Sequence, residues 1–146
     1  DHHSFWSYEV NDFVDLGTKE DFLKFAKRFS TYFCDIDGVI FKNRGYFGSN
    51  TWLDKPVPLT NNIDALLSRL KNGAKIIFTT SRPSHLRDKT IRDLQDVGFN
   101  DFELIMDLGH SSRFIINDFA PTNPYPSCES ISIPRDSDLS TYLNSY

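Results

Sequence analysis

Short apolar runs along this chain alternate with stretches in which apolar residues recur at helical spacing. The runs are rich in Phe and Ile and have the length of buried strands. They predict strands at 31–37, 74–80, 102–106 and 114–116, and a further one at 130–133.

The stretches between the runs predict helices. Thr18 is a typical N-cap, and Glu20 and Asp21 in the first turn suit the positive end of the helix dipole. Later helices are marked by one apolar face and a closing glycine. We expect helices from Thr18, over 60–71, between Pro83 and Gly98, and over 138–143. This alternation predicts an α/β protein, a Rossmann-like three-layer sandwich with a mainly parallel sheet covered on both faces.

Composition and charge exclude several classes of protein. The 146 residues suffice for one domain, and the net charge of −4 gives no basic field for nucleic acid or an anionic membrane. No apolar stretch approaches the ~18 residues of a membrane span, and the N-terminus lacks a signal-peptide pattern. Cys34 and Cys128 suit reduced thiols rather than a disulfide framework. We therefore expect a cytoplasmic protein with no nucleic-acid or membrane partner.

Polar side chains close three of the predicted strands. Asp35 and Asp37 end the first, the stretch 80–82 (Thr-Ser-Arg) ends the second, and Asn117 and Asp118 follow the fourth. Parallel strands end at one edge of a sheet, so we expect these side chains to gather there. The alternative is that each is an ordinary strand-to-loop cap. Three in chain order favour a shared site, and buried carboxylates there suit a divalent cation.

The ordered set resembles the haloacid dehalogenase (HAD) superfamily of phosphatases. Residues 35–39 (Asp-Ile-Asp-Gly-Val) match the first motif, an aspartate pair after a buried strand. Residues 76–80 match the second motif, an apolar strand ending in Thr, and 81–83 (Ser-Arg-Pro) are similar to the sequence that often follows it. Residues 114–118 match the fourth motif. The resemblance implies a HAD-like core and a phosphatase.

Phosphate-ester hydrolysis gives these residues roles. The reaction needs a nucleophile, a proton for the leaving oxygen and positive charge beside the phosphoryl oxygens. Asp35 would attack phosphorus and form an aspartyl-phosphate, and Asp37 would protonate the leaving alcohol and then activate water. Thr80 would hold a phosphate oxygen, with Ser81 beside it, and Gly38 would support the turn.

The resemblance also implies Mg²⁺, which takes oxygen ligands in octahedral geometry. Its expected ligands are Asp35, the backbone carbonyl of Asp37, and Asp118. The fourth motif more often has paired acids, and Asn117 replaces the first of them here. We expect Asp118 to supply the charge and Asn117 to support it.

The third family motif is a Lys or Arg that binds phosphate and steadies the nucleophile. Arg113, just before the fourth predicted strand, is the first candidate, and Arg82 is the second. The alternative for Arg113 is a surface residue at the start of a strand.

The spacing of the motifs leaves no room for the cap domain of larger family members. Residues 42–58, rich in glycine, proline and aromatic residues, predict a loop or hairpin flap. Tyr46, Phe47 and Trp52 on this flap are candidates for a gate or a subunit contact. Capless members of the family either accept bulky substrates or use a neighbouring subunit to exclude water, and we expect a homo-oligomer.

Two weaker resemblances concern biological context. Residues 8–21 resemble the closing stretch of sugar nucleotidyltransferases, so we divide the chain into an N-terminal extension with a linker helix (1–30) and a phosphatase domain (31–146). A nucleotidyltransferase, covalently linked or separate, is then an expected partner. Residues 116–126 look like those of phosphatases of capsule and surface-polysaccharide biosynthesis. This implies a small sugar- or polyol-phosphate as substrate.

Three alternative functions remain open. A metal-dependent glycosyltransferase also uses a pair of aspartates of the form DxD, although the polar ends at Thr80 and Asp118 argue against it. A phosphotransferase or mutase uses the same aspartyl-phosphate, but without a cap it would struggle to exclude water. A non-catalytic partner domain would result if Arg113 and Asn117 do not serve.

Overall fold

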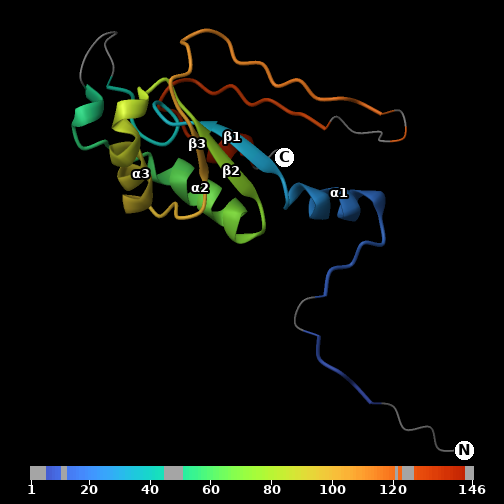
Figure 1. The fold of residues 1–146 in the computed structure, drawn as a ribbon. Helices are drawn as coiled ribbons and strands as arrows, with labels where there is room; N and C mark the ends of the chain where they lie inside the picture. The colour runs from blue at the N-terminus through green and yellow to red at the C-terminus, as the bar shows by residue number, and fades with distance from the viewer. Residues whose placement is uncertain (1–5, 11–12, 45–50, 121, 123–126, 144–146) are drawn as a thin grey trace, which may run out of the picture.

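A three-stranded parallel sheet forms the centre of the computed structural model, which describes residues 6–10, 13–44, 51–120, 122 and 127–143. The strands are β1 (Thr31–Asp35), β2 (Lys75–Thr79) and β3 (Glu103–Ile105), and they lie in the order β1-β2-β3. Cys34 is in register with Phe78, and Phe78 with Leu104. The predicted α/β class and parallel sheet are confirmed (Figure 1).

Helical crossovers join the strands and cover one face of the sheet. α2 (Thr60–Lys71) leads from β1 to β2, and η2 (Ser84–Leu86) with α3 (Arg87–Asp96) leads from β2 to β3. Alternate strand residues pack with the apolar faces of these helices in one core, because side chains alternate across a strand. The buried core residues are Cys34, Ile36, Ile40, Phe41, Ile63, Leu66, Ile76, Phe78, Leu94, Phe99, Leu104, Leu139 and Leu143.

The other face of the sheet is open among the described residues, so the predicted cover on both faces is wrong there. Phe33 of β1 and Ile105 of β3 expose 51% and 44% of their surface on this face. The physical reason is the strand order. Right-handed crossovers that advance in one direction, from β1 to β2 to β3, place their helices on the same side. A third layer would require a crossover in the opposite direction.

Two predicted strands are absent from the described structure. The segments 114–116 and 130–133 pair with no strand, and Phe114 and Ile116 are 84% and 94% exposed. Figure 1 shows the chain after β3 running away from the sheet and returning beside itself. The two arms are joined at Ser127, whose hydroxyl donates to the Asp118 carbonyl (2.7 Å). Such short apolar runs do not define a strand unless a partner edge fixes their register.

The flap predicted at 42–58 is closed at its base like a hairpin. Phe41 and Pro58 form an antiparallel bridge, and the Lys42 amide donates to the Val57 carbonyl (2.8 Å). Beyond the bridge, η1 (Thr51–Leu53) carries Trp52. Tyr46 and Phe47 lie outside the described residues.

The terminal helices agree with the sequence patterns, and they are short. α1 (Lys19–Lys27) begins with a capping box, in which Asp21 and Thr18 bond each other's backbone amides. α1 buries none of its residues, and the proposed boundary at residue 30 stays a prediction. α4 (Ser140–Leu143) covers the second half of the predicted C-terminal helix. No helix in the described ranges is long and apolar enough to cross a bilayer.

Candidate functional site

A tight turn at the carboxyl end of β1 presents the two aspartates. Asp35 is the last residue of β1, and the amides of Ile40 and Phe41 both donate to the Ile36 carbonyl (2.9 and 3.1 Å). Gly38 has φ +99°, a conformation that L side chains rarely adopt. A Cβ at this position would also come within 3.0 Å of the Arg135 side chain. The supporting role predicted for Gly38 thus has a conformational basis.

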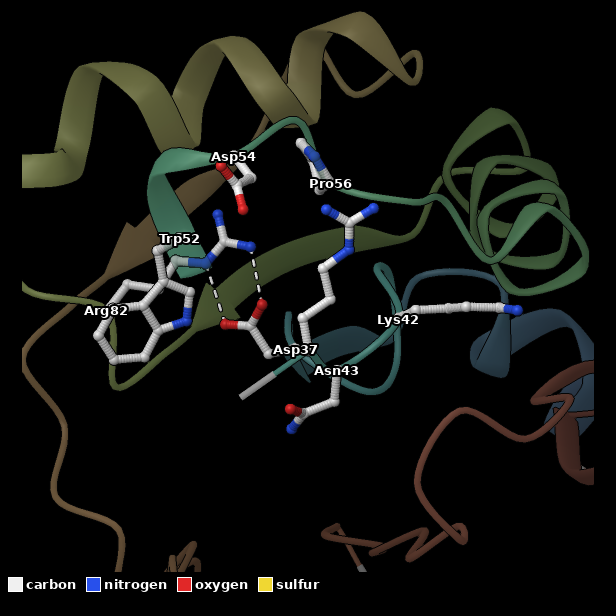
Figure 2. A pocket seen from close by; sticks show the side chains of 8 residues that line it. Asp37, Lys42, Asn43, Trp52, Asp54, Pro56 and Arg82 are labelled. Atoms are coloured by element: carbon white, nitrogen blue, oxygen red, sulfur yellow. Dashed lines mark hydrogen bonds and ion pairs between the residues drawn. The ribbon is translucent and has the colours of Figure 1, made fainter. Parts of the chain in front are cut away.

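Asp37 forms a two-pronged ion pair with Arg82. Arg82 Nε and Nη2 donate to the two carboxylate oxygens at 2.9 and 2.8 Å, as Figure 2 shows. The Arg82 side chain is 3% exposed and that of Asp37 is 22% exposed. This fork-to-fork geometry fixes the plane of the carboxylate as well as its distance.

Residues of α3 hold Arg82 from the other side. Its Nη1 donates to Thr90 Oγ1 (3.5 Å) and to Asp93 Oδ2 (3.4 Å). Lys89 Nζ lies 2.7 Å from the same Asp93 oxygen. The guanidinium also lies 5.6 Å from the centre of the Phe41 ring. Arg82, the second candidate for the phosphate-binding cation, is thus engaged with protein groups on several sides.

Asp35 faces Arg113, the first candidate for the phosphate-binding cation. Arg113 Nη1 is 3.4 Å from Asp35 Oδ1, and both side chains are partly exposed. Burial raises the pKa of Asp35 above its ordinary value, and the nearby Asp37 adds to this shift. Arg113 acts in the opposite direction and lowers the pKa of Asp35. Arg113 is therefore placed to support the ionised form of this carboxylate.

The end of β2 lies beside the aspartates, as predicted for Thr80 and Ser81. Asp35 is in register with Thr79, the residue before Thr80. Thr80 is 1% exposed, and its hydroxyl accepts the Arg82 amide (3.1 Å). This hydroxyl therefore shapes the turn that directs Arg82 towards Asp37. Ser81 between them is half-buried.

The predicted fourth-motif residues are not gathered at this edge. Asn117 and Asp118 are exposed, and Asn117 donates its side-chain amide to the Ser127 carbonyl (3.4 Å). Within the described ranges, no three Asp, Glu, His or Cys side chains form a group that could hold a metal ion. The predicted Mg²⁺ ligand set thus fits only in part. Asp35 and the backbone of Asp37 are together, and Asp118 is not grouped with them.

A small hollow of about 20 Å³ that opens to solvent is lined in part by the Asp37–Arg82 pair. Figure 2 shows the ion pair in its wall, with Trp52 beside Arg82 and the Lys42 side chain directed away from the pair. The full lining is Asp37, Lys42, Asn43, Arg44, Trp52, Asp54, Pro56 and Arg82. The flap residue Trp52, expected to form a gate or a subunit contact, therefore lines a space next to Asp37, the expected acid–base residue.

Cys34 is a packed thiol, as expected. It is buried next to Asp35, and burial with the nearby Asp35 charge raises its pKa to about 12. Cys128 is also a free thiol, but it is half-buried and lies in no strand.

Sequence reasoning missed Thr90 and Asp93. Both lie on the side of α3 that carries the buried Leu94, and Thr90 is 1% exposed. The available signal was a polar pair at i and i+3 within the apolar stripe of an amphipathic helix, which requires a buried partner.

Comparisons with known proteins add no relative. The chain matches no protein-family model, no curated protein and no solved structure.

Proposed function

We propose that this chain is a capless phosphomonoesterase of the haloacid dehalogenase type that acts through an aspartyl-phosphate on Asp35. The observation that carries the proposal is the pair of carboxylates at the end of β1, each facing its own arginine. One arginine is partly exposed, as a phosphate ligand must be, and the other is buried.

The residues divide the chemistry between them. An Asp35 oxygen forms a bond to phosphorus while the bond from phosphorus to the leaving oxygen breaks, and Asp37 supplies the proton to that oxygen. Water then attacks phosphorus, the Asp35–phosphorus bond breaks, and Asp37 accepts the proton from water. Arg113 lies 3.4 Å from Asp35 and would offset the charge on the phosphoryl oxygens.

Mg²⁺ is part of the proposal because a phosphate monoester and two aspartates bring several negative charges together. The Asp35 carboxylate and the Asp37 carbonyl are oxygen ligands of the kind Mg²⁺ binds, and the remaining positions would be filled mainly by water and phosphate. When bound, the ion would supply positive charge beside the phosphoryl oxygens.

The substrate proposed is a small sugar- or polyol-phosphate from polysaccharide or nucleotide-sugar biosynthesis. This part rests on the sequence resemblance, as do a homo-oligomer and a nucleotidyltransferase partner. Cytoplasmic localisation is proposed from the sequence composition. The position of Asp37 in the wall of the hollow supports a leaving group on that side, because the residue that protonates the leaving oxygen must adjoin it.

A non-catalytic partner domain is the second candidate. The observation that favours it is the separation of Asp118 from the other predicted metal ligands. A glycosyltransferase is tested at the same time by offering a UDP-sugar in place of the phosphate ester.

Phosphate release tests the proposal directly. p-Nitrophenyl phosphate and a panel of sugar and polyol phosphates are incubated with the protein in Mg²⁺ and in EDTA. We expect turnover in Mg²⁺ that EDTA abolishes. An absence of release from every compound, with the fold intact, would favour the partner domain, and UDP-sugar turnover would favour the glycosyltransferase.

A pH profile tests the role of Arg113. Because Arg113 lowers the pKa of Asp35 and the nucleophile must be ionised, Arg113→Gln moves the acid limb of the kcat/KM profile to higher pH. It also lowers kcat/KM by about 10²-fold through the lost phosphate contact. The matched control is Arg92→Gln, at an exposed site on α3. An acid limb that stays at the same pH would show that Arg113 does not affect the ionisation of Asp35.

A further inference from the structure

Arg82 is the most completely enclosed charge of the described site. Its guanidinium makes four hydrogen bonds, two to Asp37 and one each to Thr90 and Asp93. Only 3% of its side chain is exposed. A cation that binds an incoming phosphate needs free N–H groups and a solvent-accessible approach. Most N–H groups of Arg82 are already bonded to protein, and its side chain is almost fully buried.

Charges of alternating sign run from the site into α3. Three ion pairs form this series: Asp37 with Arg82, Arg82 with Asp93, and Asp93 with Lys89. Their nearest N–O distances are 2.8, 3.4 and 2.7 Å. The last pair lies on one helix at i and i+4, so the backbone of α3 fixes it. Each member limits the position of the next, and Asp37 at the end is held in one orientation.

The fork fixes the direction of the Asp37 carboxylate. Two parallel N–H groups of Arg82 bond its two oxygens, so the carboxylate cannot rotate without losing both hydrogen bonds. A base must meet the proton that it accepts in a defined geometry, and this contact supplies that geometry for Asp37.

We propose that Arg82 is a positioning residue that holds Asp37 as the base for hydrolysis of the aspartyl-phosphate, and that Asp93 and Lys89 hold Arg82 in turn. The inference rests on the proposed function. In this step the water oxygen bonds to phosphorus, the bonding pair of the Asp35–phosphorus bond returns to the Asp35 carboxylate, and the water proton passes to Asp37. In this role Arg82 acts through Asp37 and makes no bond to the attacking water or to the phosphoryl group.

Burst kinetics with p-nitrophenyl phosphate separate the two halves of the reaction. p-Nitrophenolate leaves without a proton, so formation of the phosphoenzyme does not need Asp37 as an acid. Arg82→Lys keeps the charge and loses the fork, so hydrolysis of the phosphoenzyme slows and kcat falls by about 10²-fold. For Arg82→Lys we expect a burst approaching one p-nitrophenolate per protein, followed by a slow steady state. The steady-state kcat should be the same for phosphate esters of other alcohols.

Asp93→Asn provides a second variant that leaves the Asp37–Arg82 contact atoms unchanged. It should show the same burst with a smaller fall in kcat, and it decides the question if Arg82→Lys does not fold. Arg92→Lys and Asp96→Asn, at exposed sites of the same helix, are the controls and should behave as wild type.

The outcomes are distinct. A burst in folded Arg82→Lys or Asp93→Asn supports the inference, because a loss of folded protein would lower the amplitude rather than raise it. Lower or unchanged turnover without a burst in the folded variants overturns the inference and leaves the phosphatase proposal intact. If the wild-type protein releases no phosphate, the proposed function fails, and the inference fails with it.

Discussion

Asp35→Asn abolishes phosphate release, lowering kcat by at least ~10⁴-fold, and leaves a protein that is more stable than the wild type at neutral pH. The loss follows from the removal of the nucleophile, for which an amide is no substitute. The gain in stability follows from burial, which raises the pKa of Asp35 in the folded protein. The wild-type protein is therefore less stable because it keeps at Asp35 a charge that the reaction requires.

The sign of the stability effect can be checked against pH. Because the pKa of Asp35 is higher in the folded than in the unfolded chain, its ionisation removes stability as pH rises between the two values. The advantage of Asp35→Asn should thus be small at about pH 4 and larger at about pH 7. Arg113 loses its partner in the variant, but it is partly exposed and water can solvate it.

Thermal denaturation of both proteins at the two pH values, with phosphate release measured in parallel, tests this prediction. Asp101→Asn, at an exposed aspartate before β3, is the control and should change neither quantity. Retained turnover in Asp35→Asn would show that Asp35 is not the nucleophile. A lower melting temperature at neutral pH would mean that the Arg113 contact outweighs the cost of burial.

Arg82→Met destabilises the fold by about 3 kcal/mol or more. Removing one partner from a buried ion pair leaves the other charge without compensation, and Arg82 has two such partners. Asp93 keeps Lys89, but Asp37 loses both hydrogen bonds from the guanidinium. Methionine has a similar length and can pack against Phe41, so the loss reports mainly on charge.

Urea denaturation measures this effect. Arg92→Met on the exposed side of α3 should change the free energy of unfolding by no more than about 0.5 kcal/mol. Equal stability of Arg82→Met and the wild type would show that the buried pair contributes nothing, and the account of Arg82 as the anchor of Asp37 would then lose its basis.

The parallel sheet was predictable because its strands carry their own signals. β1 and β2 are apolar runs bounded by turn residues, and α2 and α3 show clear periodicity and are followed by glycines with positive φ. The segment 114–116 shows the limit of this reasoning. Three apolar residues carry no register, and whether they pair depends on an edge far away in sequence. The open face of the sheet depends in turn on strand order, which periodicity does not encode.

Part of the candidate site could likewise be predicted from the sequence, and part could not. Asp35 and Asp37 were predictable because two carboxylates after an apolar strand need compensation, and Gly38 because the turn requires a positive φ. The partner of each carboxylate was not predictable. Arg82 and Arg113 were alternatives for one role in the sequence, and only the folded chain assigns them to different aspartates.

Trapping the phosphoenzyme tests the central claim most directly. Asp37→Asn lacks the base for the second step, so incubation with p-nitrophenyl phosphate and Mg²⁺ followed by an acid quench should preserve the intermediate. Mass spectrometry of the peptides should then find the phosphoryl group on Asp35. A phosphoryl group on another residue, or an unmodified Asp35 in a protein that still releases p-nitrophenolate, would contradict the account.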